Sequence, residues 1–201
     1  MYKRQNSSDI GAYGCYDKAD DSLEARKYKV STAMRITNYT DAAEYIYAYL
    51  GEGSPLRVEE FMQELEKIAA SKDDYDKKDC AGYIYAARNN QGATGATSEF
   101  TGQVKFFGSI KDLGGYDKLI PGMELFQGFR KTPTSNQFYS SHIGVYAGKQ
   151  TIQGTLMPAV YQSSPGYTST VRKYGKANGP DLTKLGDSWN YWGWSKFIRL
   201  R

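Results

Sequence analysis

The sequence contains only one histidine, His142, and only two cysteines, Cys15 and Cys80, among 201 residues. A closed structural zinc site needs four Cys or His ligands, so a single chain cannot build one. Two cysteines in unlike contexts do not form a disulfide framework either, and we expect both to be free thiols.

Long apolar runs are also absent. The longest apolar stretches cover a few residues, which is too short for a membrane span. The first eight residues are basic and polar and no apolar segment follows them, so no signal peptide is visible. The net charge of +4 is mild for a nucleic-acid-binding domain, and we expect no nucleic-acid partner. It fits an ordinary solvated surface, and also attraction to an anionic polymer such as a bacterial wall.

The length is that of one domain with a short appendage. Residues 1–35 are polar and rich in charge, and we interpret them as an arm preceding a domain of residues 36–201. Three helices are predicted to open this domain. Thr40 is the expected N-cap of the first, Pro55 the first helical residue of the second, and Asp79 the N-cap of the third, over residues 80–89.

The composition then changes. A loop rich in Gly, Thr and Ser is expected at residues 91–102, followed by segments with the alternation of strands. We expect strands at residues 104–107, 123–127, 142–147, 151–156, 159–162 and 196–200. Helices followed by an antiparallel sheet define an α+β domain.

Cys80 stands at the predicted start of the third helix, directly after Asp79. A thiolate there faces unpaired backbone N–H groups and the positive end of the helix dipole, so we expect a lowered pKa. The same N–H groups can stabilise an oxyanion when a carbonyl is attacked. A free cysteine is also commonly an inert core residue, and position alone leaves both interpretations open.

His142 lies on the strand predicted over residues 142–147. Alternation places it on one face and Ile143 and Val145 on the other, apolar face. Gln162, on a neighbouring strand, is placed to bond with the far imidazole nitrogen, and a cysteine–histidine pair needs such a group to fix the tautomer. Taken singly, both residues are more often structural.

The order and spacing of these residues resemble the NlpC/P60 cysteine peptidases, papain-like hydrolases of peptidoglycan stem peptides. The family's Asp-Cys-Ser-Gly, Pro-Gly-Asp-Leu and Ser-His-Val-Gly-Ile-Tyr segments and its third polar residue correspond to residues 79–82, 121–126, 141–148 and 160–162. Residues 189–198 resemble the closing strand of phage or bacterial lysins. Ala81 departs from the family's Ser, and Gln162 from its commoner His. Tyr75 is the nearest candidate for the tyrosine that lines the site before the Cys, and Tyr49 is another.

This resemblance implies a papain-like α+β fold, with N-terminal helices packed on a central antiparallel sheet and the nucleophile at a helix N-terminus. It implies hydrolysis of a stem-peptide amide, often the γ-D-glutamyl bond to a diamino acid, without a cofactor or metal. Cys80 is then the nucleophile, His142 the general base and Gln162 its orienting residue. Substrate contacts are expected from Asp79, Ser141 and Tyr75. Such an enzyme is secreted or otherwise acts on the bacterial wall, and we expect a monomer.

Other functions remain open. A CHAP-type amidase or endopeptidase shares the Cys-then-His order and the polymer, although Pro121-Gly122 and Gln162 favour NlpC/P60. In lipid acyltransferases the His precedes the Cys, against the order here. A catalytically inactive wall-binding module would rely on the C-terminal aromatic residues, and its distinguishing feature would be the loss of the Cys or the His.

Overall fold

The structure, a computed structural model, describes residues 33–127, 130–131, 138–166 and 172–201. Its centre is a seven-stranded sheet in which only the pairing of β1 with β3 is parallel. In spatial order the strands are β1 (Met34–Arg35), β3 (Val104–Ser109), β10 (Trp189–Ser195), β4 (Glu124–Gln127), β7 (His142–Ile152), β8 (Thr155–Ser164) and β9 (Gly179–Lys184). The chain is therefore an α+β domain with a mostly antiparallel sheet.

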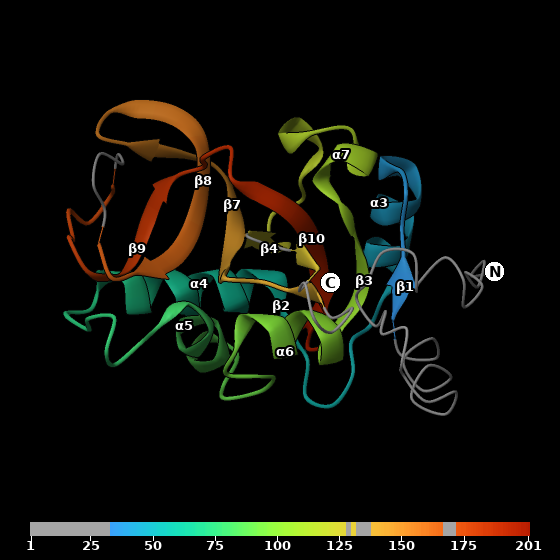
Figure 1. The fold of residues 1–201 in the computed structure, drawn as a ribbon, viewed down its shortest axis with the longest axis horizontal. Helices are drawn as coiled ribbons and strands as arrows, with labels where there is room; N and C mark the ends of the chain where they lie inside the picture. Colours follow the sequence, from blue (N-terminus) through green and yellow to red (C-terminus); the bar gives the residue numbers. More distant parts are fainter. Residues whose placement is uncertain (1–32, 128–129, 132–137, 167–171) are drawn as a thin grey trace.

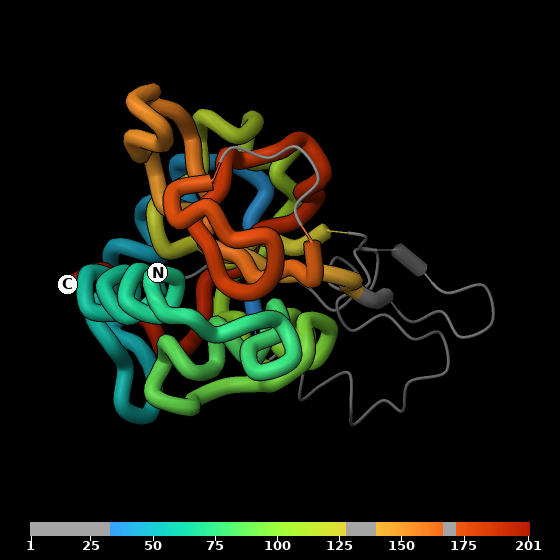
Figure 2. Tube along the Cα trace, turned by 90° about the vertical axis from the view of Figure 1, so that its left-hand side faces the viewer, coloured from blue at the N-terminus to red at the C-terminus, as the bar shows by residue number. Residues whose placement is uncertain are grey.

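The helices of the described residues lie at two places around this sheet (Figure 1). The helices are α3 (Tyr39–Ala48), α4 (Val58–Ala70), α5 (Cys80–Ala87), α6 (Ala96–Gly102) and α7 (Ile110–Leu113), with a 3-10 turn at Tyr116–Lys118. Figure 2 shows α4, α5 and α6 as a layer beneath the strands. Helices α3 and α7 lie beside β3, at the opposite end of the sheet from β9 (Figure 1).

Two small ladders complete the described fold. Strand β2 (Leu56–Arg57) runs parallel to β11 (Ile198–Arg199), which ties the start of α4 to the end of the chain. Strands β5 (Arg130–Lys131) and β6 (Phe138–Tyr139) form an antiparallel pair.

The apolar stripe of α4 forms the contact between the helices and the sheet. Its residues Val58, Phe61, Leu65 and Ala69 are buried, at the helical spacing that the sequence predicts. Burying a side chain as large as Phe61 or Leu65 contributes roughly 1.5–3 kcal/mol each. The hydroxyl of Tyr83 on α5 donates to the carbonyl of Leu65, so the two helices are also joined by a hydrogen bond of 2.5 Å.

Two predicted helix starts are wrong. Asn38, not Thr40, caps α3, because its side chain accepts from the Asp41 amide at 2.9 Å. Pro55 does not open α4. It precedes β2, and the helix begins after Arg57, whose amide donates to Glu60 in a capping box. The third start is confirmed: Asp79 caps α5, and Asn89 and Asn90 end it in the left-handed region.

The loop predicted at residues 91–102 contains a helix, α6. Its Thr, Ser and Gly residues have weak helix propensity, but tertiary contacts override that preference. Glu99 of α6 forms an ion pair with the buried Arg88 at 2.6 Å, and Phe100 is fully buried. These contacts anchor the segment to the core.

The strand predicted at residues 151–156 is instead a hairpin. Strand β7 continues to Ile152 and β8 starts at Thr155, with Gln153 and Gly154 at positive φ between them. Such a two-residue turn matches the twist of paired strands. The predicted strand at residues 196–200 is the short β11. Strand β9 was not predicted. Strand β10 lies within residues 189–198, which resemble a closing strand, and it stands inside the sheet between β3 and β4.

Of the arm expected at residues 1–35, only its last three residues are described. Ala33 is buried, and Met34 and Arg35 form β1 beside β3, with Arg35 ion-paired to Asp112 at 2.8 Å. The remainder of the arm, including Cys15, lies outside the described residues. Every helix in the described ranges falls short of the length and apolarity that a membrane crossing needs.

Candidate active site

Cys80 is the first residue of α5, and its side chain is 8% exposed. Asp79 fixes this end of the helix, because its carboxylate accepts from the Gly82 amide at 2.6 Å. A residue at the first helical position has no acceptor for its amide inside the helix. The Cys80 amide is therefore suited to receive an oxyanion that forms next to the sulfur.

The sulfur of Cys80 is surrounded by hydrogen-bond donors. The backbone N–H groups of Ile143 and Ala81 and the hydroxyl of Tyr75 lie near it and each lowers the pKa of the thiol, which favours the thiolate. Burial acts the other way and has the largest effect, and the charge of Asp79 adds to it. The net result is a thiol pKa above its usual value. The lowered pKa expected from the helix start is therefore wrong.

The Ile143 amide places the thiol at the beginning of β7, one residue from His142. Cys80 and His142 do not form a direct hydrogen bond with each other in the structure. Catalytic hydrogen bonds are often loose without substrate and tighten in the complex, so the placement still permits proton transfer.

His142 is bonded on its far side. Its Nε2 lies 2.8 Å from Oε1 of Gln162, which stands on β8. The Gln162 amide nitrogen donates to the hydroxyl of Thr183 on β9 at 2.6 Å. Thr183 is fully buried and donates to the Val160 carbonyl at 3.5 Å. Burial lowers the pKa of His142, and the Gln162 bond partly opposes this.

The ring of Trp189 covers one face of the imidazole. The two ring centroids are 5.5 Å apart with an interplanar angle of 26°, and Trp189 is 4% exposed. Gly144 makes room for this ring, because a Cβ there would come within 2.9 Å of the indole and 3.0 Å of the Tyr161 carbonyl. The stack and the Gln162 bond together restrict the orientation of His142.

The three expected substrate-binding residues differ in their surroundings. Tyr75 is close to Cys80: its pKa is raised first by burial and then by the nearby thiol and the Asp79 carboxylate. Asp79 is exposed beside the thiol. Ser141 is exposed too, but its hydroxyl and its amide both donate to the Gln127 carbonyl, at 3.2 and 3.0 Å. Ser141 thus joins the entry of β7 to the end of β4.

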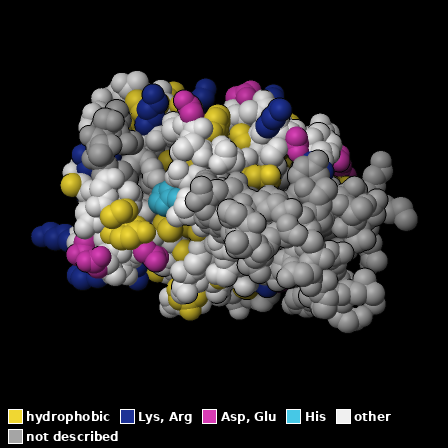
Figure 3. Space-filling model, in the orientation of Figure 1, with side chains coloured by type: hydrophobic (Ala, Val, Ile, Leu, Met, Phe, Trp, Pro, Cys, Tyr) yellow, Lys and Arg dark blue, Asp and Glu magenta, His cyan; other side chains and the backbone are white. Residues whose placement is uncertain are grey.

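The imidazole reaches the molecular surface. Figure 3 shows the single histidine on the face drawn there, with hydrophobic side chains beside it. Within the described ranges, no three Cys, His, Asp or Glu side chains gather closely enough to hold a metal ion.

Sequence reasoning missed Thr183 and Trp189. Residues 179–181 have the composition of a turn, so the strand that carries Thr183 gave no signal. Trp189 belongs to an aromatic segment in which Trp192 and Trp194 are core residues. The neighbouring residues give no sign that Trp189, unlike the other two, contacts His142. The aromatic ring that packs beside Gly144 could not be identified from the sequence.

The chain matches no protein-family model, and no curated protein or solved structure is significantly similar to it. Any functional conclusion therefore rests on the geometry of the site and on the motif resemblance.

Proposed function

We propose that the chain is a cysteine peptidase of the NlpC/P60 kind that hydrolyses an amide bond in peptidoglycan stem peptides. The observation that carries this proposal is the chain of contacts at the Cys80 sulfur. The Ile143 N–H lies near the sulfur and lowers the pKa of the thiol, and the adjacent His142 is bonded to Gln162 and, through it, to Thr183. A nucleophile, a base and an orienting group are the parts that nucleophilic catalysis requires.

The order of elements supports a papain-like arrangement. The nucleophile begins a helix, the base begins a strand later in the chain, and the orienting residue lies on the next strand. The helical layer precedes most of the antiparallel sheet in sequence, and it covers one side of that sheet.

In the proposed reaction His142 accepts the thiol proton as the Cys80 sulfur attacks the amide carbonyl. The C–S bond forms, and the oxyanion lies near the amide of Cys80. The C–N bond then breaks, and the imidazolium returns the proton to the leaving amine. Water, deprotonated by His142, hydrolyses the thioester, which releases the carboxylic acid and restores the thiol. Burial favours the neutral thiol and the neutral imidazole, so the proton moves during attack rather than before it.

The test is incubation with purified muropeptides, with the products identified by mass spectrometry. A new free amine and carboxyl group within the stem peptide is expected, and Cys80→Ala should abolish it while leaving the fold intact. Cleavage between the sugar and the first amino acid would favour the CHAP-type amidase. Equal cleavage by wild type and Cys80→Ala would overturn the assignment of the nucleophile.

A further inference from the structure

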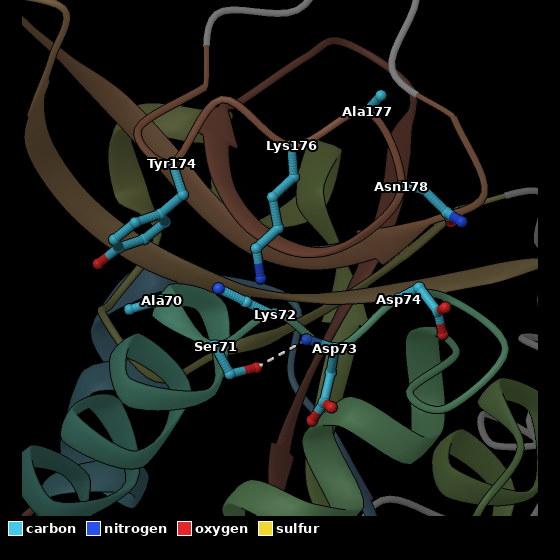
Figure 4. Close-up of a pocket in the computed structure, with 9 residues that line it drawn as sticks. All are labelled: Ala70, Ser71, Lys72, Asp73, Asp74, Tyr174, Lys176, Ala177 and Asn178. Atoms are coloured by element: carbon cyan, nitrogen blue, oxygen red, sulfur yellow. Dashed lines mark hydrogen bonds between the residues drawn. The ribbon is translucent and has the colours of Figure 1, made fainter.

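A pocket of about 480 Å³ lies between the end of α4 and the loop before β9 (Figure 4). Residues 70–74 form one wall and residues 174–178 the other. None of the residues that the sequence predicts for the candidate active site lines this pocket. The lining is nevertheless distinctive, because the side chains of Lys72 and Lys176 extend into the pocket from opposite walls.

Lys176 reaches into the pocket from the upper wall in Figure 4, and Lys72 extends towards it from below. The ammonium nitrogen of Lys176 is buried, and it has no hydrogen-bond partner within the described residues. Among the residues that the structure describes, neither Lys72 nor Lys176 belongs to a salt bridge. A buried ammonium group without a partner carries a desolvation cost, and an anion bound beside Lys176 would offset that cost.

The nearby carboxylates do not fill this role. Asp73 and Asp74 line the pocket, but in Figure 4 their carboxylates turn away from the two ammonium groups. Asp181 accepts from the backbone amides of Tyr174, Lys176 and Leu182, so it holds the loop in shape. Burial lowers the pKa of Lys176, and Asp181 and Asp73 oppose this only partly by their charges.

The pocket is joined to the candidate active site through the backbone on both walls. On one wall, Asp74 is followed by Tyr75, whose side chain lies near the Cys80 thiol. On the other wall, Asn178 leads directly into β9, the strand that carries Thr183. Gly179 lies tightly against the first wall, since a Cβ there would come within 2.5 Å of the Asp73 carbonyl. One short stretch of backbone, residues 70–75, therefore runs from the pocket to the tyrosine beside Cys80.

We propose that this pocket is a subsite for a carboxylate of the peptide substrate, bound by Lys176 and Lys72 away from the amide that is cut. A lysine ammonium recognises an anion as a point charge, and a buried one contributes more than one in open water. The inference rests on the proposed peptidase function, because it takes the ligand to be that enzyme's substrate.

The experiment measures binding to Cys80→Ala protein by titration calorimetry, so that no substrate is consumed. One ligand is a purified stem peptide with free carboxylates, and the other is the same peptide with its carboxylates converted to amides. The free acid is expected to bind about tenfold more tightly, the effect of one charge-assisted contact. Adding Lys176→Gln should remove this preference, and Lys72→Gln should reduce it.

Lys149→Gln is the matched control, since Lys149 is an exposed lysine on the β7–β8 hairpin, and the charge change is the same. An equal loss of preference in Lys149→Gln and Lys176→Gln would mean a general charge effect and would overturn the subsite. If Lys176→Gln does not fold, as judged by circular dichroism, Lys72→Gln carries the test alone.

Parallel assays of wild type separate the two proposals. If wild type cleaves the peptide but neither amidation nor the lysine changes alter binding, the subsite is wrong and the peptidase stands. If wild type cleaves no muropeptide while Cys80→Ala shows the Lys176-dependent preference, the peptidase is wrong and the carboxylate site stands. If there is neither cleavage nor binding, both are wrong.

Discussion

The side-chain amide of Gln162 donates to the buried hydroxyl of Thr183 at 2.6 Å, and this turns its carbonyl oxygen towards His142. A carbonyl oxygen can only accept, so the imidazole carries its hydrogen on Nε2. Nδ1 is then left without a proton and is the atom able to act as a base. The tautomer that the proposed reaction needs is thus set by the Thr183 hydroxyl on β9, which acts on His142 through Gln162.

Replacing Thr183 with Val keeps the shape of the side chain but removes the hydroxyl that holds Gln162. We expect turnover to fall by about tenfold, the lower end of what loss of an outer hydrogen bond costs. Gln162→Ala should cost more, by roughly one to three orders of magnitude. Because the Gln162 bond raises the pKa of His142, both changes should also move the acid limb of kcat/KM to lower pH.

Thr183→Ser is the control, since it retains the hydroxyl and should keep most of the activity. A Thr183→Val enzyme with wild-type turnover and an unmoved acid limb would show that Thr183 has no positioning role.

The parts of this site that local sequence determines were the predictable ones. Asp79 before Cys80 forms a helix start, and the stripe from Val58 to Ala69 gives α4 its buried face, because both patterns act over a few residues. Thr183 and Trp189 could not be placed in the same way. Thr183 contacts Gln162, and Trp189 contacts His142, only because strands that are distant in the sequence lie together in the sheet. The sequence does not indicate the register in which those strands align.

Long-range contacts also explain the helix that was missed. Residues 96–102 are poor helix formers in isolation, but Glu99 is ion-paired to Arg88 and accepts from the Ala93 amide at 2.9 Å. A buried ion pair is visible only once both partners are placed, and neither residue carries a local signal for it.

Gly144→Ala should disturb the imidazole by moving the ring that covers it. The added Cβ would lie 2.9 Å from the Trp189 ring and 2.8 Å from Val160, so the neighbours must shift. We expect a loss of about 1–3 kcal/mol in the free energy of unfolding, as for other overpacked cores, together with a fall in kcat. Urea denaturation and steady-state kinetics measure the two effects.

Gly186→Ala is the matched control, because a Cβ at this exposed glycine would meet no atom within 4 Å. It should leave both quantities unchanged. A Gly144→Ala protein as stable and active as Gly186→Ala would contradict the described packing of Trp189 on the His142 side of the sheet.

The pH dependence of the wild-type activity should reflect a neutral Cys80 thiol beside a neutral His142 imidazole. The pKa of His142 is lowered by burial, so the acid limb of kcat/KM should lie below the ordinary histidine value of 6.5. The pKa of Cys80 is raised by burial above 9.0, so the rate of alkylation by iodoacetamide should still be rising at pH 9.0 rather than level. A thiol alkylated fastest near neutral pH would instead indicate a preformed thiolate–imidazolium pair.

The same shift of His142 affects stability in acid. A histidine whose folded pKa is lowered stabilises the fold above its unfolded value and loses that contribution as the pH falls through the folded one. His142→Gln removes the titrating group. We therefore expect the variant to lose less stability than wild type between pH 6.5 and acid, measured by thermal unfolding.

The last prediction concerns Glu124, which is fully buried beside Glu99 and Arg88. The two carboxylates share one guanidinium, and the Oε2 atom of Glu124 has no partner within the described residues. Burial, reinforced by the charge of Glu99, raises the pKa of Glu124 from 4.5 to about 8. The folded state therefore holds this proton over a range in which the unfolded chain has released it. The resulting stability is complete below pH 4.5 and is lost as the pH rises through 8.

Glu124→Gln resembles the protonated acid and cannot ionise, so its stability relative to wild type should increase from pH 5 to pH 8.5 in urea denaturation. Arg88→Met should destabilise the fold at every pH, by about 3–5 kcal/mol, because it leaves a buried carboxylate without its partner. Lys67→Met, in the exposed pair with Glu64, is the control and should change stability by less than about 1 kcal/mol. A constant difference between Glu124→Gln and wild type across this range would mean that Glu124 is ionised throughout, with Arg88 compensating both carboxylates.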